Sequence, residues 1–150
     1  MDESTQIALI LPDPAATERL AAIIAGQARA GDAILLSGDL GAGKTHFARA
    51  FINALTAALE EVPSPTFTLV QSYALPNGGA AHHFDLYRLS GPGGLAELGW
   101  DEAREGIVLV EWPDRLGPLA PADALRVTLA PGADEDSRSA RIEGWEGRLA

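Results

Sequence analysis

Residues 38–45 read Gly-Asp-Leu-Gly-Ala-Gly-Lys-Thr and match the pattern G-x-x-x-x-G-K-[ST]. An apolar run of strand length, residues 33–36, precedes this stretch, and apolar residues at helical spacing follow it between positions 47 and 55. In this context, glycines let successive backbone N–H groups turn inward around a phosphate, and the start of the helix adds a favourable dipole. The stretch therefore predicts a phosphate-binding loop.

The parts of this loop have different expected roles. Lys44 is expected to reach the β- and γ-phosphates of a nucleotide, and the Thr45 hydroxyl is placed to coordinate Mg²⁺. Backbone N–H groups around the phosphates are expected from Asp39, Leu40, Gly41, Ala42 and Gly43.

Lys44 is the only lysine among the eleven Lys and Arg residues, so any chemistry that needs a lysine depends on it. We expect its side chain to face solvent and to contribute no core packing. The guanine-binding motif Asn/Thr-Lys-x-Asp would need a second lysine, which excludes GTP binding by that route and leaves ATP as the default nucleotide.

The rest of the chain alternates apolar runs with helical patterns. Asp13-Pro14 is a helix-start signal, after which Leu20, Ile23 and Ile24 recur at helical spacing up to a plausible stop at Gly31. Strands are predicted at residues 6–11, 33–36, 67–73, 81–86, 107–110, 125–129 and 140–142. This order predicts an α/β fold, a three-layer P-loop domain spanning residues 1–150, with a mixed, mainly parallel sheet and hairpin additions.

Composition excludes several classes of protein. The 150 residues include no cysteine, so disulfides, thiolate metal sites and thiol catalysis are excluded. A formal net charge of −10 disfavours direct binding to DNA, RNA or anionic lipid. The N-terminus is acidic, and prolines with Asn77-Gly78 interrupt the long uncharged stretch 62–84. We expect a cytoplasmic protein without a membrane segment.

Two acids stand where ligands of α/β proteins bind, at the carboxyl ends of apolar strands. Glu111 follows residues 107–110, and Asp85 follows residues 82–84. Nucleotide hydrolases use such an acid to hold Mg²⁺ or its waters, and both remain candidates for that task. His83 shares a strand face with Asp85, so we expect it to orient that acid.

Ser64-Pro65-Thr66-Phe67 lies between the helix after the loop and the next strand. Other P-loop proteins carry at this place a loop whose threonine senses the γ-phosphate. A proline-stiffened turn with Phe67 in the core explains the same residues without a ligand.

Four blocks in order now resemble one family. They are GDLGAGKT at 38–45, SPTFTLVQSY at 64–73, HFDLYRL at 83–89 and EWP at 111–113. Together they resemble the TsaE family, the bacterial P-loop ATPases of tRNA threonylcarbamoyladenosine synthesis. The resemblance covers nearly the whole chain and implies ATP and Mg²⁺ as cofactors and a TsaB–TsaD pair as partners. In that family, hydrolysis is thought to reset the pair after TsaD modifies the tRNA, so tRNA would be bound only through the partners.

The resemblance also implies roles for individual residues. Lys44 and Thr45 would bind phosphate and Mg²⁺, with Glu111 as a second Mg²⁺ ligand. Of the others, Asp85 would be an acid needed for hydrolysis, Thr66 would lie in a switch-like loop, and Trp112 would lie beside the nucleotide. The family usually has a second threonine where this chain has His46, so a contact to the α-phosphate is either lost or made by His46.

Hydrolysis by the isolated protein is expected to be slow, since no arginine finger is evident near the loop. Arg49 lies one helical turn beyond Thr45, and Arg88 follows Asp85 by three residues. Two other functions fit the phosphate-binding loop. One is a small-molecule kinase, although the run 104–115 is too poor in arginine to resemble a lid. The other is a nucleotide-dependent binding module whose hydrolysis is incidental.

Overall fold

The computed structural model describes residues 6–38, 43–56, 70–76, 79–87, 89, 92–133 and 137–145. Five of the predicted site residues lie outside these ranges, namely Asp39, Leu40, Gly41, Ala42 and Thr66. The turn residues Asn77 and Gly78 and the side chain of Arg88 also lie outside them.

The described strands form one seven-stranded sheet in the order β1-β7-β6-β2-β5-β4-β3. Parallel ladders join β6, β2, β5 and β4, whereas β3 and β7 run antiparallel to their neighbours. Because β1 is antiparallel to β7, it runs in the same direction as the four central strands. The strands are β1 Gln6–Leu11, β2 Ala33–Ser37, β3 Val70–Ala74, β4 Ala80–Asp85, β5 Ile107–Glu111, β6 Leu125–Pro131 and β7 Arg138–Glu143.

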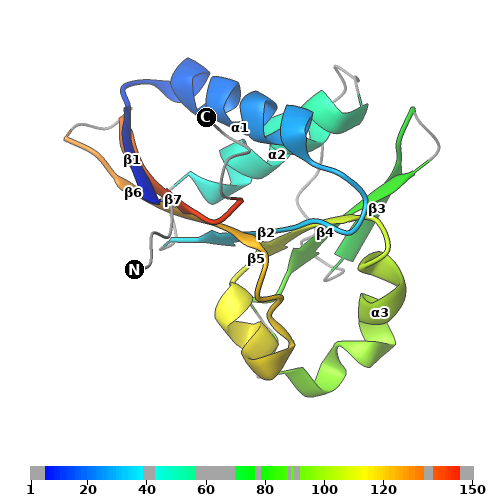
Figure 1. Ribbon diagram of the computed structural model, residues 1–150. Helices are drawn as coiled ribbons and strands as arrows, with labels where there is room; N and C mark the ends of the chain where they lie inside the picture. Colours follow the sequence, from blue (N-terminus) through cyan, green and yellow to red (C-terminus); the bar gives the residue numbers. More distant parts are fainter. Residues whose placement is uncertain are drawn as a thin grey trace.

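Helices cover both faces of this sheet, which completes three layers (Figure 1). The helices α1, Pro14–Gln27, and α2, Lys44–Thr56, pack on one face. The short helix α3, Trp100–Ala103, and the 3₁₀ helices η1 Pro92–Gly94, η2 Ala96–Leu98 and η3 Pro113–Leu119 lie on the other. The predicted fold class, a mixed and mainly parallel α/β sheet with added hairpins, is confirmed.

The start of α1 follows the predicted signal closely. Asp13 is the N-cap, and its side chain accepts a hydrogen bond of 2.9 Å from the backbone N–H of Ala16. Pro14 occupies the first turn, where its missing N–H has no helical partner to lose. The helix ends at Gln27, and Gly31 takes a φ of +94° in the turn that follows.

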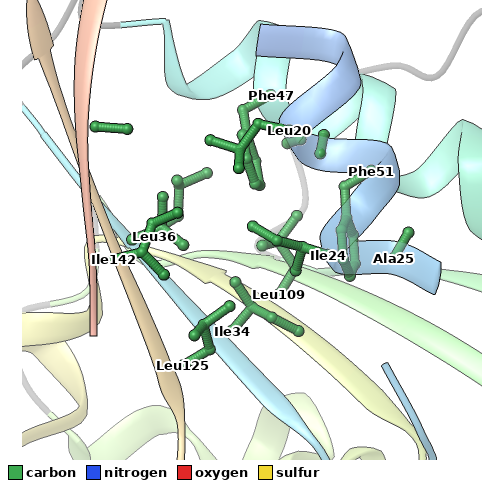
Figure 2. Packing of buried hydrophobic residues seen from close by; sticks show 14 of the residues in the cluster. Leu20, Ile24, Ala25, Ile34, Leu36, Phe47, Phe51, Leu109, Leu125 and Ile142 are labelled. Atoms are coloured by element: carbon green, nitrogen blue, oxygen red, sulfur yellow. The ribbon is translucent and has the colours of Figure 1, made fainter. Parts of the chain in front are cut away.

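Two apolar clusters hold the layers together. The larger cluster lies between α1, α2 and the sheet. Figure 2 shows part of it, with Phe47 and Phe51 of α2 above Ile34 and Leu36 of β2. The smaller cluster fills the other face around Phe84, whose ring meets Trp100 edge to face at 5.2 Å. Each large side chain buried here contributes about 1.5–3 kcal/mol of transfer free energy to the folded state.

The expected apolar faces of the two long helices need correction in detail. Ile23 is 59% exposed, because the buried face of α1 runs through Leu20, Ala21 and Ile24 and leaves Ile23 on the far side. Ala54, which the helical spacing between positions 47 and 55 places on the apolar face of α2, is exposed, and Ile52 is fully buried instead. In the described part of the chain, no helix is long and apolar enough to cross a membrane.

The register of the parallel strands sets the position of the predicted acids. Glu111 pairs with Leu36 of β2 on one side and with Asp85 of β4 on the other. The end of β2, from which the chain enters the loop at residues 38–43, therefore lies at the same sheet edge as both carboxylates. The fold therefore brings Lys44, Asp85 and Glu111 together from three separate sequence blocks.

Candidate functional site

A cleft of about 430 Å³ opens at this edge of the sheet. Of the nine described residues that line it, seven are predicted above from the sequence and two are not. The predicted ones are Gly43, Lys44, Thr45, His46, Asp85, Glu111 and Trp112. The other two are Arg49 and Arg138.

The Lys44 side chain is held inside the cleft wall, and the expectation that it faces solvent is wrong. Only 5% of the residue is exposed. Its Nζ donates a hydrogen bond of 2.6 Å to the carbonyl of Gly38 and lies 3.6 Å from the centre of the Trp112 ring. A desolvated ammonium above an indole ring is attracted by the negative face of the ring. Lys44 is therefore packed as well as charged.

Trp112 has the backbone conformation that places its ring over Lys44. Its φ of 61° and ψ of 55° lie in the left-handed region, which non-glycine residues rarely adopt. Pro113 follows and begins η3, so the chain turns sharply as soon as β5 ends. The ring also meets Tyr87 at 4.9 Å, and Tyr87 is itself 46% exposed. These contacts place the Trp112 ring between Lys44 and Tyr87.

Glu111 is a buried carboxylate with a buried partner. Its Oε2 lies 2.7 Å from Nε2 of His83, and the two side chains are 5% and 3% exposed. A hydrogen bond donated from Nε2 satisfies this oxygen and fixes the direction of the carboxylate, as partners of metal-binding acids commonly do. His83 was expected to orient Asp85, but its hydrogen bond is with Glu111.

Asp85 is half-buried at the end of β4. Its Oδ1 accepts a hydrogen bond of 3.2 Å from the backbone N–H of Tyr87. Burial raises the pKa of the Asp85 carboxyl above its ordinary value, and the neighbouring charge of Glu111 raises it further. The Tyr87 N–H bond, His83 and Lys44 act in the opposite direction without cancelling the rise. The fold therefore disfavours the ionised form of Asp85, which is common for acids with a task in a site.

The raised pKa of Asp85 yields a prediction that separates function from stability. Because the folded protein holds this proton more tightly than the unfolded chain, the Asp85 charge lowers stability at neutral pH. Asp85→Asn keeps the acceptor for Tyr87 and removes the charge, so we expect a higher Tm at pH 7 together with loss of hydrolysis. Below the unfolded-state pKa near 3.8, the gain in Tm should vanish, since Asp85 is then protonated in both states.

Thermal melts of the wild type and of Asp85→Asn across pH, with ATP hydrolysis measured at pH 7, test this expectation. Asp101→Asn is the matched control, because Asp101 is an exposed acid in the first turn of α3 and does not line the cleft. A lower Tm for Asp85→Asn at neutral pH would show that the ionised carboxylate stabilises the fold.

His46 is turned toward the neighbouring helix. Its Nε2 lies 3.3 Å from the carbonyl oxygen of Pro14 and 3.1 Å from Oε2 of Glu18, both on α1. The side chain thus links the first turns of α1 and α2 while still lining the cleft. The sequence left two possibilities for His46: its side chain contacts the α-phosphate, or that contact is lost. The contacts of His46 with Pro14 and Glu18 favour the second possibility.

Two arginines, Arg49 and Arg138, line the cleft, although the sequence makes no arginine finger evident near the loop. Arg49 follows Thr45 by four residues, so both side chains project from one face of α2 into the cleft. That spacing was visible in the sequence. Arg138 comes from β7, almost a hundred positions after the loop, and its place in the cleft depends on a strand order that no local pattern reveals.

The donor set suits a phosphate bound together with a hard cation. Thr45, Asp85 and Glu111 offer oxygen atoms, and Lys44, Arg49 and Arg138 offer positive charge. Within the described residues, no group of three or more His, Asp or Glu side chains could hold a metal alone. Mg²⁺ is typically bound by one or two protein oxygens together with substrate phosphates, and these residues fit that mode.

Comparison with known proteins settles the relationship. The model of the family described as threonylcarbamoyl adenosine biosynthesis protein TsaE matches residues 11–140. This chain belongs to the TsaE family. The match includes the phosphate-binding loop, both acids and Trp112, which confirms the resemblance inferred from the four sequence blocks.

Individual TsaE proteins agree with this assignment. The protein from Rickettsia felis is 38% identical over 135 residues, covering 89% of this chain and 78% of the relative. The one from Bacillus subtilis is 34% identical over 128 residues, covering 83% and 77%. The crystal structure of Bacillus subtilis YdiB superposes with a TM-score of 0.76 at 28% identity, covering 99% of this chain and 92% of that one.

Proposed function

We propose that this TsaE-family protein is a cytoplasmic, Mg²⁺-dependent ATPase that energises or resets a TsaB–TsaD complex in the synthesis of N6-threonylcarbamoyladenosine in tRNA. The observation that carries the proposal is one cleft in which Lys44 of the loop, Thr45 and the paired strand-end acids Asp85 and Glu111 meet. Family membership supports the pathway, and the motif at residues 38–45 supports the nucleotide.

Each residue has a task that follows from its surroundings. Lys44, held between Gly38 and Trp112, supplies positive charge beside the phosphates. Thr45 and Glu111 would hold Mg²⁺, and His83 fixes the direction of the Glu111 carboxylate. The cation, when bound, neutralises charge that develops on the phosphates.

Asp85 is placed to position the attacking water or to accept its proton. Its raised pKa brings the carboxyl closer to neutral pH, where a general base is most effective. The Tyr87 N–H bond holds the side chain at the strand end rather than leaving it mobile. Thr66, which the family resemblance places in a switch-like loop, completes the proposed catalytic set.

The role in tRNA modification is proposed to run through protein partners. A net charge of −10 disfavours binding to the phosphates of tRNA, so tRNA contact is assigned to TsaB–TsaD. Hydrolysis here would then drive a change in the partner complex and not the chemistry on tRNA itself.

Partner stimulation is the test of this role. The isolated protein should hydrolyse ATP slowly, since Thr45 and Arg49 are exposed and water weakens electrostatic stabilisation at the reacting phosphate. Addition of TsaB–TsaD from the same organism should accelerate single-turnover hydrolysis. The gain should be smaller than the ~10³–10⁵ contributed by an arginine finger supplied in trans. That limit applies because Arg49 and Arg138 already line the cleft.

Lys44→Ala protein mixed with the same pair provides the background rate. Fast hydrolysis by the wild type alone, with no response to the pair, would contradict the coupling role. Transfer of the γ-phosphate to a metabolite at a comparable rate would point to a kinase instead.

A further inference from the structure

One half of the sheet is covered by helices on a single face only. The smaller apolar cluster takes its buried strand residues from β2, β4 and β5, and none of its described members comes from β1, β6 or β7. Figure 1 shows the short helices lying below the β2, β5 and β4 half of the sheet. The corresponding side of β1, β7 and β6, which we call the open face, carries the exposed residues Ala8, Ile10, Arg126, Thr128 and Arg141.

The open face has a positive charge that its own neighbours do not neutralise. Within the described part of the chain, no ion pair includes Arg126 or Arg141. Arg126 at least stands opposite an acid, because the register pairs it with Glu143. Arg141 lies between Thr128 of β6 and Ala8 of β1, so its row across the sheet holds no acid. In a chain with a net charge of −10, this is a local site for an acidic group from outside.

The strand next to Arg141 is an edge strand without the usual protection. β1 is the last strand in the sheet order and pairs with β7 on one side. Natural edge strands commonly carry charges, proline or a bulge, which discourage pairing with another chain. Residues 6–11 have no charge and no proline, and their register with β7 is unbroken over the whole strand. Ile10, 81% exposed, is the most exposed large hydrophobic side chain among the described residues.

The geometry of an added strand follows from this register. An eighth strand beside β1 would lie two strand spacings from β7, roughly 9.6 Å. Its residue opposite Ala8 would share a row with Arg141, and the small Ala8 side chain between them leaves the guanidinium room to reach across. Its residue opposite Ile10, two positions away on the same face, would cover that exposed side chain. The best match is an acid in the first place and an apolar residue in the second.

We propose that β1 accepts an extended segment of a protein partner as an eighth strand, with an acidic side chain of that segment beside Arg141. Backbone hydrogen bonds along the edge supply affinity in this mode of recognition, and alternate side chains supply specificity. A second copy of this chain fits less well. Its β1 offers no acid to Arg141, and two molecules with a net charge of −10 repel each other. The surface is separate from the nucleotide cleft, so the inference does not depend on ATP hydrolysis.

The experiment uses the peptide Val-Thr-Glu-Thr-Val, which presents its glutamate between two valines on one face in either strand direction. NMR titration of the whole protein measures its Kd, and amide hydrogen exchange reports where it binds. We expect slower exchange in residues 6–11 and no change in β3, the strand at the other edge. Arg141→Glu should raise the Kd about 5- to 20-fold at low salt, as for loss of an exposed ion pair and its replacement by repulsion.

Two controls isolate the role of charge. A peptide with lysine in place of glutamate should bind Arg141→Glu better than it binds the wild type. Arg29→Glu makes the same change in net charge at an exposed arginine near the β3–β4 hairpin, and it should bind the glutamate peptide about as tightly as the wild type. At about 1 M salt the difference between Arg141→Glu and the wild type should largely disappear.

Several results would overturn the inference. They are absence of peptide binding, exchange protection outside residues 6–11, and an equal loss of affinity in Arg29→Glu and Arg141→Glu. Sedimentation of the protein without peptide supplies another, since self-association that protects residues 6–11 would assign the edge to a second copy. If Arg141→Glu does not fold, Arg141→Gln replaces it, with an expected loss of about two- to fivefold. An unchanged Kd for that variant would be equally contrary.

Discussion

Alanine at position 44 is expected to abolish ATP hydrolysis, with a fall in kcat on the order of 10²–10³ or more. Lys44 is the only lysine of the chain, and no other ammonium can replace it beside the phosphates. Lys44 itself is only 5% exposed, and removal of a preorganised charge that is shielded from water costs more than removal of the same charge at a surface. Arg49 and Arg138 line the cleft from other directions and do not substitute for it.

The burial of Lys44 complicates this variant and suggests a better one. The side chain is buried with its Nζ over the Trp112 ring, so alanine removes packing as well as charge and should lower Tm. Lys44→Met keeps most of the stem and removes only the charge. Both variants should lose hydrolysis in a coupled phosphate-release assay, but only alanine should melt clearly earlier. Normal turnover by a folded Lys44→Met protein would end the interpretation of residues 38–45 as a phosphate-binding loop.

The fold was largely predictable, because its strands are either fully apolar or bounded by strong turn signals. The run 33–36 and the run 107–110 have no polar residue, as is typical of strands buried on both faces, and they became the adjacent central strands β2 and β5. Asp13-Pro14 carries its own start signal and capped α1 as expected. Local chemistry decides these elements, so a single sequence is sufficient.

Burial within the helices was less predictable. Ile23 and Ile24 are adjacent and equally apolar, but only one of them can face the sheet. The choice depends on how α1 and α2 pack together, which is a property of the whole layer. Apolar spacing alone overestimated the width of the buried face.

The candidate site shows the same division between local and long-range information. Residues 43–45 were predicted because they match a known sequence pattern. Glu111 and Asp85 were predicted because each follows an apolar strand. Contacts across strands were not found, since the His83–Glu111 bond and the approach of Arg138 to Gly43 both depend on strand order. Arginine also carries no turn or strand signal, so nothing local distinguished Arg138 from the other nine arginines.

Glu111→Gln is expected to remove the Mg²⁺ dependence of nucleotide binding. The glutamine oxygen can still accept the hydrogen bond from His83, so the buried pair keeps its geometry and loses only its charge. Hard cations prefer anionic oxygen, and changes around such ligands reduce metal affinity by roughly 10- to 100-fold or more. We therefore expect a loss on the order of 100-fold in ATP affinity when Mg²⁺ is present.

Without Mg²⁺ the same variant should bind ATP as well as the wild type or better, because the carboxylate otherwise repels the phosphates bound beside it in the cleft. Calorimetric titration of ATP in EDTA and in Mg²⁺ measures both values, and an equal loss in the two conditions would remove Glu111 from the metal site.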